Sequence, residues 1–72
     1  MGIAIRNSQV PGLAPRRRAA GLSQQALGEL VGVGRLAILR WENGQQAPGL
    51  KKLAKLAEAL DCLAEDLLRE AS

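Results

Sequence analysis

The chain has 72 residues, enough for one domain. Leu and Ala supply most of its apolar content, and a single tryptophan is its only aromatic residue. Leu and Ala favour helices, and β-branched residues are too few to build a sheet, so we expect an all-α protein. A chain this short buries only about 60% of the surface that its unfolded form exposes, so its core is marginal and forming a dimer would stabilise it.

Charge is distributed unevenly along the chain. Ten basic residues against seven acidic ones give a formal net charge of +3. Residues 1–40 hold six arginines and one acid, a net of +5, whereas residues 41–72 hold four basic residues and six acids, a net of −2. This asymmetry fits a protein with one anion-binding face, and it also fits ordinary surface charge.

The residue types present argue against several kinds of site. A lone Cys62 cannot form an internal disulfide, and we expect it to be a small buried apolar residue. Without histidine or tyrosine, the chain offers no usual zinc site and no nucleophile–base pair, so we expect neither an enzyme nor a cofactor. No apolar stretch approaches the ~20 residues of a membrane span and no signal peptide is visible, which predicts a cytoplasmic protein without membrane contact.

We expect residues 1–12 to form an N-terminal arm that precedes a domain over residues 13–70. The alternation of Ile3 and Ile5 is compatible with a short strand, and the terminal position with a frayed segment. The first helix is predicted to begin near residue 13, because Pro15 lacks an N–H and must lie in the first turn. Gly21 ends this helix.

A short turn joins the second and third predicted helices. Ser23 is a good N-cap for the second helix, and Gly28 within it indicates the close approach of another helix. Its apolar face is formed by Leu27, Leu30 and Val31. Gly32 supplies a left-handed stop and Gly34 caps the third helix, so about three residues separate the two. Such a short connection forces a sharp crossing, which is typical of a helix-turn-helix.

The third predicted helix has two contrasting faces. Its core-facing side carries Ala37, Ile38 and Trp41, and its opposite side carries Arg35, Leu36, Leu39, Arg40 and Asn43. Arginines on the outward face of such a helix suit guanine edges or phosphates. The two leucines leave two hypotheses open. They could contact thymine methyl groups in a major groove, or they could form a small apolar patch for a partner protein.

Two further helices follow a loop over residues 43–49. The fourth helix has an apolar stripe of Leu50, Leu53, Leu56, Ala57 and Leu60, and solvent-facing lysines at 51, 52 and 55. Asp61 takes the left-handed position after it. The fifth helix, over residues 64–70, offers Leu67 and Leu68, which we expect to provide a two-fold contact, either alone or with the N-terminal arm.

In this order and spacing, the residues resemble the phage-repressor or Cro-like helix-turn-helix family of the xenobiotic-response-element type. The matching pieces are "GLSQQALGELVGV", "RWENG", "APGL" and "LAKLAEAL", and the resemblance covers about residues 13–68. It implies a five-helix, lambda-repressor-like domain that binds double-stranded operator DNA, usually as a homodimer, with the third helix in the major groove.

The resemblance also implies roles for individual residues. The residues matched to DNA contacts, or lying on the same face, are Gln24, Arg35, Leu36, Leu39, Arg40, Asn43 and Gln46. Among them, Arg35, Leu36 and Arg40 match base-reading positions, and Asn43 with the loop to Gln46 matches a phosphate contact. The charged pair that ties the family's first helix to the end of its third corresponds to Arg17 and Glu42.

The chain departs from the family pattern at several positions. Gly34 and Gly49 stand where many members have Ser or Thr, and Leu36 and Leu39 replace residues that are usually polar. The opening "IAIRNS" is similar to antitoxins. Two functions are therefore considered: a repressor that binds a palindromic operator, and an interaction module that binds a toxin or another regulator through these leucines or the N-terminal arm.

Overall fold

The helix boundaries follow the caps that the sequence supplies. The computed structural model describes residues 8–69, and these form five helices without a strand. The helices are α1 (Leu13–Ala19), α2 (Gln24–Val31), α3 (Arg35–Glu42), α4 (Leu50–Ala59) and α5 (Ala64–Leu68). The Ser23 side chain caps α2 by accepting from the Ala26 N–H at 2.9 Å, and Asp61 has the left-handed φ of 53° that we expected after α4. The all-α prediction is confirmed.

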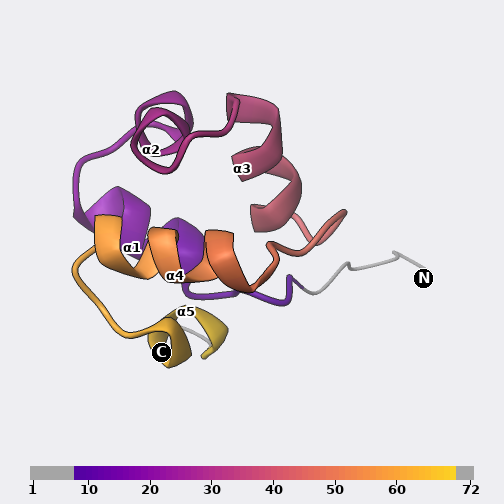
Figure 1. Cartoon of the computed structure of the whole chain (residues 1–72), viewed down its shortest axis with the longest axis vertical. Coiled ribbons are helices and arrows are strands. Elements are labelled where there is room, and N and C mark those ends of the chain that lie inside the picture. Colours follow the sequence, from indigo (N-terminus) through magenta and orange to yellow (C-terminus); the bar gives the residue numbers. More distant parts are fainter. Residues whose placement is uncertain (1–7, 70–72) are drawn as a thin grey trace, which may run out of the picture.

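The helices are arranged around one core (Figure 1). α2 and α3 lie together at one end of the molecule, α5 lies at the other end, and α1 and α4 lie between these ends. α2 packs against both α3 and α4, while α5 packs against α4 and α1. Every helix contributes one leucine or isoleucine with no exposed surface: Leu13, Leu27, Ile38, Leu56 and Leu67. Burial of these side chains holds the five short helices together.

Two leucines expected in the core are exposed instead. Leu30 is 61% exposed, because the buried stripe of α2 runs through Leu27, Gly28 and Val31 and leaves Leu30 roughly 100° away from its centre. Leu50 is 85% exposed, because it is the first residue of α4 and lies one turn before Leu53, where that helix first packs against the core. The prediction was wrong for both residues.

Two further expectations are corrected by contacts around α4 and α5. Lys52 does not simply face water: its Nζ donates to the Val31 carbonyl at 3.3 Å and so satisfies the C-terminal end of α2. Leu67 is fully buried and is unavailable for a contact between two copies, whereas Leu68 is 52% exposed.

Cys62 is partly buried, and this burial raises the pKa of its thiol.

The last residues of the expected arm belong to the packed domain. Val10 is buried in the core, and the Leu13 N–H donates to its carbonyl at 3.0 Å. The Gly12 N–H donates to the Leu67 carbonyl at 2.9 Å, which seats the start of α1 against α5. Residues 8–12 therefore lie on the domain. The fifth helix ends at Leu68 and not at residue 70 as expected, because the backbone of Arg69 is extended. The short strand that Ile3 and Ile5 could form, and the rest of the arm, lie outside the described residues.

Candidate nucleic-acid interface

The turn between α2 and α3 is built by glycines. Gly32 adopts a left-handed φ of 80°, and the Val33 N–H donates to the Gly28 carbonyl at 2.8 Å. A Cβ on Gly28 would lie 2.6 Å from the Val33 carbonyl oxygen, so the turn can fold back onto α2 only where no side chain is present. A close approach at Gly28 is present, but it comes from the backbone of the turn at Val33 and Gly34 and not from another helix as expected. It fixes the sharp crossing of a helix-turn-helix.

The third helix is divided as its periodicity predicts. Ile38 and Trp41 are buried in the core, while Arg35, Leu36, Arg40 and Asn43 are exposed on the other side. Leu36 is 50% exposed, and Leu39 is only half-buried. Within the described part of the chain, no carboxylate pairs with Arg35 or Arg40. The two guanidinium groups are therefore available to an external anion.

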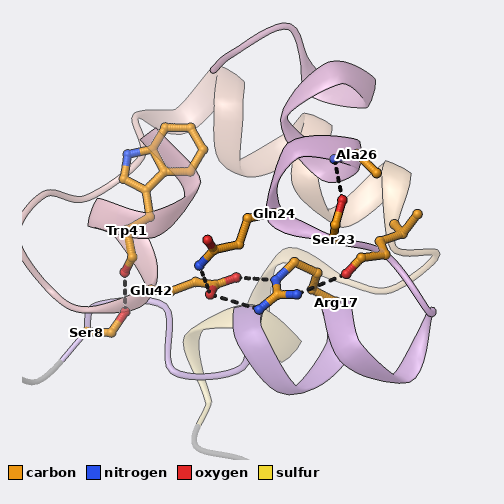
Figure 2. A network of polar contacts seen from close by, with 8 residues as sticks. Ser8, Arg17, Ser23, Gln24, Ala26, Trp41 and Glu42 are labelled. Carbon is orange, nitrogen blue, oxygen red and sulfur yellow. Dashed lines mark hydrogen bonds and ion pairs between the residues drawn. The ribbon is translucent and has the colours of Figure 1, made fainter. Parts of the chain in front are cut away.

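A buried polar cluster lies where α1, α2 and the end of α3 meet (Figure 2). Arg17 donates to both carboxylate oxygens of Glu42, from Nε at 2.6 Å and from Nη2 at 3.1 Å. Its Nη1 donates to the Leu22 carbonyl at 2.9 Å. The hydrogen bonds and charge of Glu42 raise the pKa of Arg17, although burial opposes this. The structure thus brings together the pair that the family resemblance implied.

Gln24 joins this cluster from the start of α2. Its Nε2 donates to Glu42 Oε1 at 3.0 Å, so one carboxylate oxygen accepts from both Arg17 and Gln24. Sequence reasoning assigned Gln24 to DNA and gave no intramolecular partner. Eighteen residues separate it from Glu42, and no local pattern connects the two. We call Arg17, Gln24 and Glu42 the three-helix junction.

The C-terminal end of α3 is satisfied by residues from two directions. The Ser8 hydroxyl donates to the Trp41 carbonyl at 2.7 Å, a contact that sequence reasoning did not find. The N–H groups of Gln45 and Gln46 donate to the Arg40 carbonyl at 2.9 and 3.2 Å, so the loop closes back onto the helix. Any contact of this loop with a ligand must then come mainly from side chains, such as the exposed Gln46.

Asn43, expected at a phosphate, also has local partners. With its amide nitrogen directed toward the helix, it donates to the carbonyls of Arg40 at 3.1 Å and Leu39 at 3.3 Å. This arrangement bonds last-turn carbonyls of α3 and uses both hydrogens of the amide. Asn43 and Gln46 follow the C-terminal end of α3, next to Glu42, whereas Arg35 and Leu36 lie at its start.

The described helices contain no segment long and apolar enough to cross a membrane. Nor does the described part of the chain gather three or more metal-ligating side chains into a possible metal site. The candidate site is thus a surface of exposed arginine, leucine and amide side chains on α3, and the opposite side of that helix is packed in the core.

A family model for the helix-turn-helix matches residues 16–67. The chain belongs to the helix-turn-helix family, as its motifs predicted. The turn, the three-helix junction and every core residue except Val10 and Leu13 fall within the matched residues.

Individual relatives agree with this assignment. The repressor protein C2 of Salmonella phage P22 is 37% identical over 65 residues, which cover 88% of this chain and 30% of that protein. A crystal structure of the P22 c2 repressor in complex with a synthetic operator is 32% identical, with a TM-score of 0.81 and coverage of 90% of this chain and 98% of that one. The restriction-modification controller protein C.AhdI from Aeromonas hydrophila is 39% identical, with a TM-score of 0.74 and coverage of 78% and 85%. The chain spans less than a third of the length of the curated phage repressor.

Proposed function

We propose that this chain is a sequence-specific DNA-binding transcriptional regulator, a cytoplasmic repressor with no catalytic role. The observation that carries the proposal is the outward face of α3. Arg35 and Arg40 have no acidic partner among the described residues and flank the exposed Leu36, on a helix that follows a tight turn. Relatives that include a repressor crystallised with operator DNA support this function.

The roles of the residues follow from where they lie on α3. The N-terminal part of a recognition helix contacts base edges, so Arg35 and Leu36 are placed to read sequence. Arg40, one turn further, suits a guanine edge or a phosphate, and Leu36 can contact a thymine methyl group. Leu39, half-buried beside them, packs against Leu36 or sugar carbons. Gln46 suits a phosphate oxygen, whereas Asn43 can donate to one only by giving up a local bond to the Arg40 or Leu39 carbonyl.

We further propose that two copies bind a palindromic operator. A monomer of this size reads few base pairs, and two recognition helices about 34 Å apart would reach successive major grooves. The exposed Leu68 and Leu63 lie at the α5 end of the molecule, away from α3, and are candidates for a two-fold contact. Sedimentation of the protein as a monomer that protects one half-site would contradict the dimer.

Selection from random duplexes at two salt concentrations tests the proposal. The affinity should fall linearly on a log–log salt plot, with a slope of about 0.9 per contacted phosphate. Arg40→Ala should weaken binding to the selected duplex by about 1–3 kcal/mol and binding to random duplex by less. Arg69→Ala, an exposed arginine on the opposite end of the domain, is the matched control and should leave the preference unchanged.

The other hypothesis makes the same face a docking site for a toxin or a regulator. It would replace the repressor if no duplex bound more tightly than random DNA and if Leu36→Ala abolished a complex with a protein. Binding of a selected duplex that Leu36→Ala and Arg40→Ala both weaken would exclude it.

A further inference from the structure

The Trp41 side chain is nearly buried, yet its indole N–H has no hydrogen-bond partner among residues 8–69. Only 6% of the residue is exposed, and the contact from Ser8 goes to its backbone carbonyl, not to the ring. In the same part of the chain, no fully buried side-chain nitrogen or oxygen lacks a partner, so the described residues do not enclose this N–H. Because indole is a donor and not an acceptor, the group needs an acceptor from outside residues 8–69.

Trp41 lies between two different flanks of α3. Successive residues of a helix are about 100° apart, so Arg40 and Glu42 lie on opposite flanks, with Trp41 between them on the core side. Figure 2 shows the indole nitrogen on the edge of the ring that faces away from Glu42. The N–H is therefore directed toward the Arg40 flank and not toward the three-helix junction.

The surroundings of the Arg40 flank are positive. Arg40 is exposed and has no carboxylate partner within the described part of the chain. Residues 43–57, which form the loop after α3 and most of α4, contain three lysines and no acidic residue. A hydrogen-bond donor in positive surroundings favours an anionic acceptor over a neutral one.

The dimensions of a DNA major groove indicate which anion this is. An α-helix with its side chains is about 10–12 Å across, and the groove is about 12 Å wide. A helix that presents Arg35 and Leu36 to the base edges therefore has its flanks close to the sugar-phosphate walls. Phosphate oxygens accept hydrogen bonds from neutral donors as well as from arginine and lysine.

We infer that the Trp41 indole N–H donates to a phosphate oxygen of the DNA backbone, on the same flank as Arg40. This inference rests on the proposed function for its ligand, a DNA phosphodiester. The two parts of the side chain then differ in role: the rings fill the core with Ile38, and the N–H edge binds DNA. Because a side chain packed in the core keeps its rotamer, the donor is in place before DNA arrives.

Nuclear magnetic resonance of the whole chain tests the contact directly, because a chain with one tryptophan has one indole N–H signal. Without DNA, this hydrogen should exchange readily with water. The selected duplex should move its signal downfield and slow its exchange, since an anionic oxygen then accepts the hydrogen. Protection before DNA is added, or a signal that stays in place while the backbone signals of α3 shift, would overturn the inference. Failure of wild type to prefer any duplex would instead reject the proposed function.

Binding measurements test the phosphate. Replacing Trp41 by benzothienylalanine keeps both rings and puts sulfur in place of the N–H. This variant should melt like wild type and bind the selected duplex and a random duplex about tenfold more weakly, because a hydrogen bond to a charged group is lost. The loss should be the same at both salt concentrations, since a neutral donor displaces no counterion. Fluorotryptophan, which keeps the N–H, is the matched control and should bind like wild type.

Single neutral methylphosphonates along the selected duplex then locate the contact. One position should weaken the binding of wild type more than that of the benzothienylalanine variant, and the absence of such a position would overturn the inference. A loss confined to the selected duplex would overturn the phosphate assignment in favour of a base edge. If the variant melts at lower urea than wild type, the indole signal of the wild-type protein is decisive.

Discussion

The two sides of α3 are held in different ways. Its inner side is fixed by Ile38 and Trp41 in the core and by Glu42 in the three-helix junction. On its outer side, Arg35 and Arg40 have no intramolecular ion pair among residues 8–69, and Leu36 is half exposed. The position of the helix and the identity of its outer residues are therefore separable. Substitutions on the inner side should affect folding, and substitutions on the outer side should affect binding alone.

The largest expected effect comes from breaking the junction on the inner side. Removing one partner of a buried ion pair leaves an uncompensated charge and costs about 3–5 kcal/mol. We expect Arg17→Met or Glu42→Gln to lower the free energy of unfolding by this amount, measured by urea melts. For a domain this small, that loss is a large part of its total stability.

Lys51→Met is the control for the junction, because Lys51 is exposed and has no carboxylate partner among the described residues. It should change stability by less than about 0.5 kcal/mol.

The pKa of Arg17 is raised in the folded protein. The stability that Arg17 contributes is therefore fully present below the pKa of unfolded arginine and is lost only as pH rises through the folded value. The Arg17 contribution should thus be constant from neutral pH to pH 9. Junction variants no less stable than Lys51→Met would contradict the comparison.

A smaller effect is expected where the turn closes on α2. In Gly28→Ala the new methyl group would lie 2.6 Å from the Val33 carbonyl oxygen, a backbone atom that cannot turn away. We expect unfolding to become easier by about 1–3 kcal/mol, the usual cost of overpacking. Gly49→Ser is the control: it has open space and can add a capping hydroxyl, so it should be neutral or slightly stabilising. Equal melts for the two variants would show that the turn can shift.

The smallest effect belongs to the outer side. Burying one methyl group is worth roughly 0.8 kcal/mol, so replacing thymine by deoxyuridine at a position that Leu36 contacts should weaken binding a few-fold. One or two operator positions should show this loss with wild type and none should with Leu36→Ala, whose melt should match wild type. Deoxyuridine that is harmless at every position would remove the thymine contact. A destabilised Leu36→Ala would break the separation of the two sides.

The sequence predicts the helices because their ends are encoded locally. Ser23 caps α2 and Gly32 ends it, and each residue acts within one turn of its own position. Leu30 and Leu50 show the limit of apolar periodicity. It identifies positions on one side of a helix, but how much of that side is covered depends on where the neighbouring helices lie. A sequence pattern does not contain the positions of those neighbouring helices.

The candidate site was predictable to a different degree. Periodicity alone placed Arg35 and Arg40 on the outer face, while the Arg17–Glu42 pair came only from the family resemblance. The contact of Ser8 with Trp41 spans 33 residues and joins a short hydroxyl to a backbone carbonyl, for which no residue pattern exists. Such contacts depend on the final packing of the chain.

That contact also sets the boundary of the folding unit. Ser8 donates to a carbonyl in the last turn of α3 and Val10 fills part of the core, so residues 8–12 and α3 should unfold together and not as separate parts. A fragment that starts at Leu13 would contain all five helices but would lack Val10, which is part of the core. Detaching residues 8–12 from the domain would therefore also remove contacts that hold α3 in place.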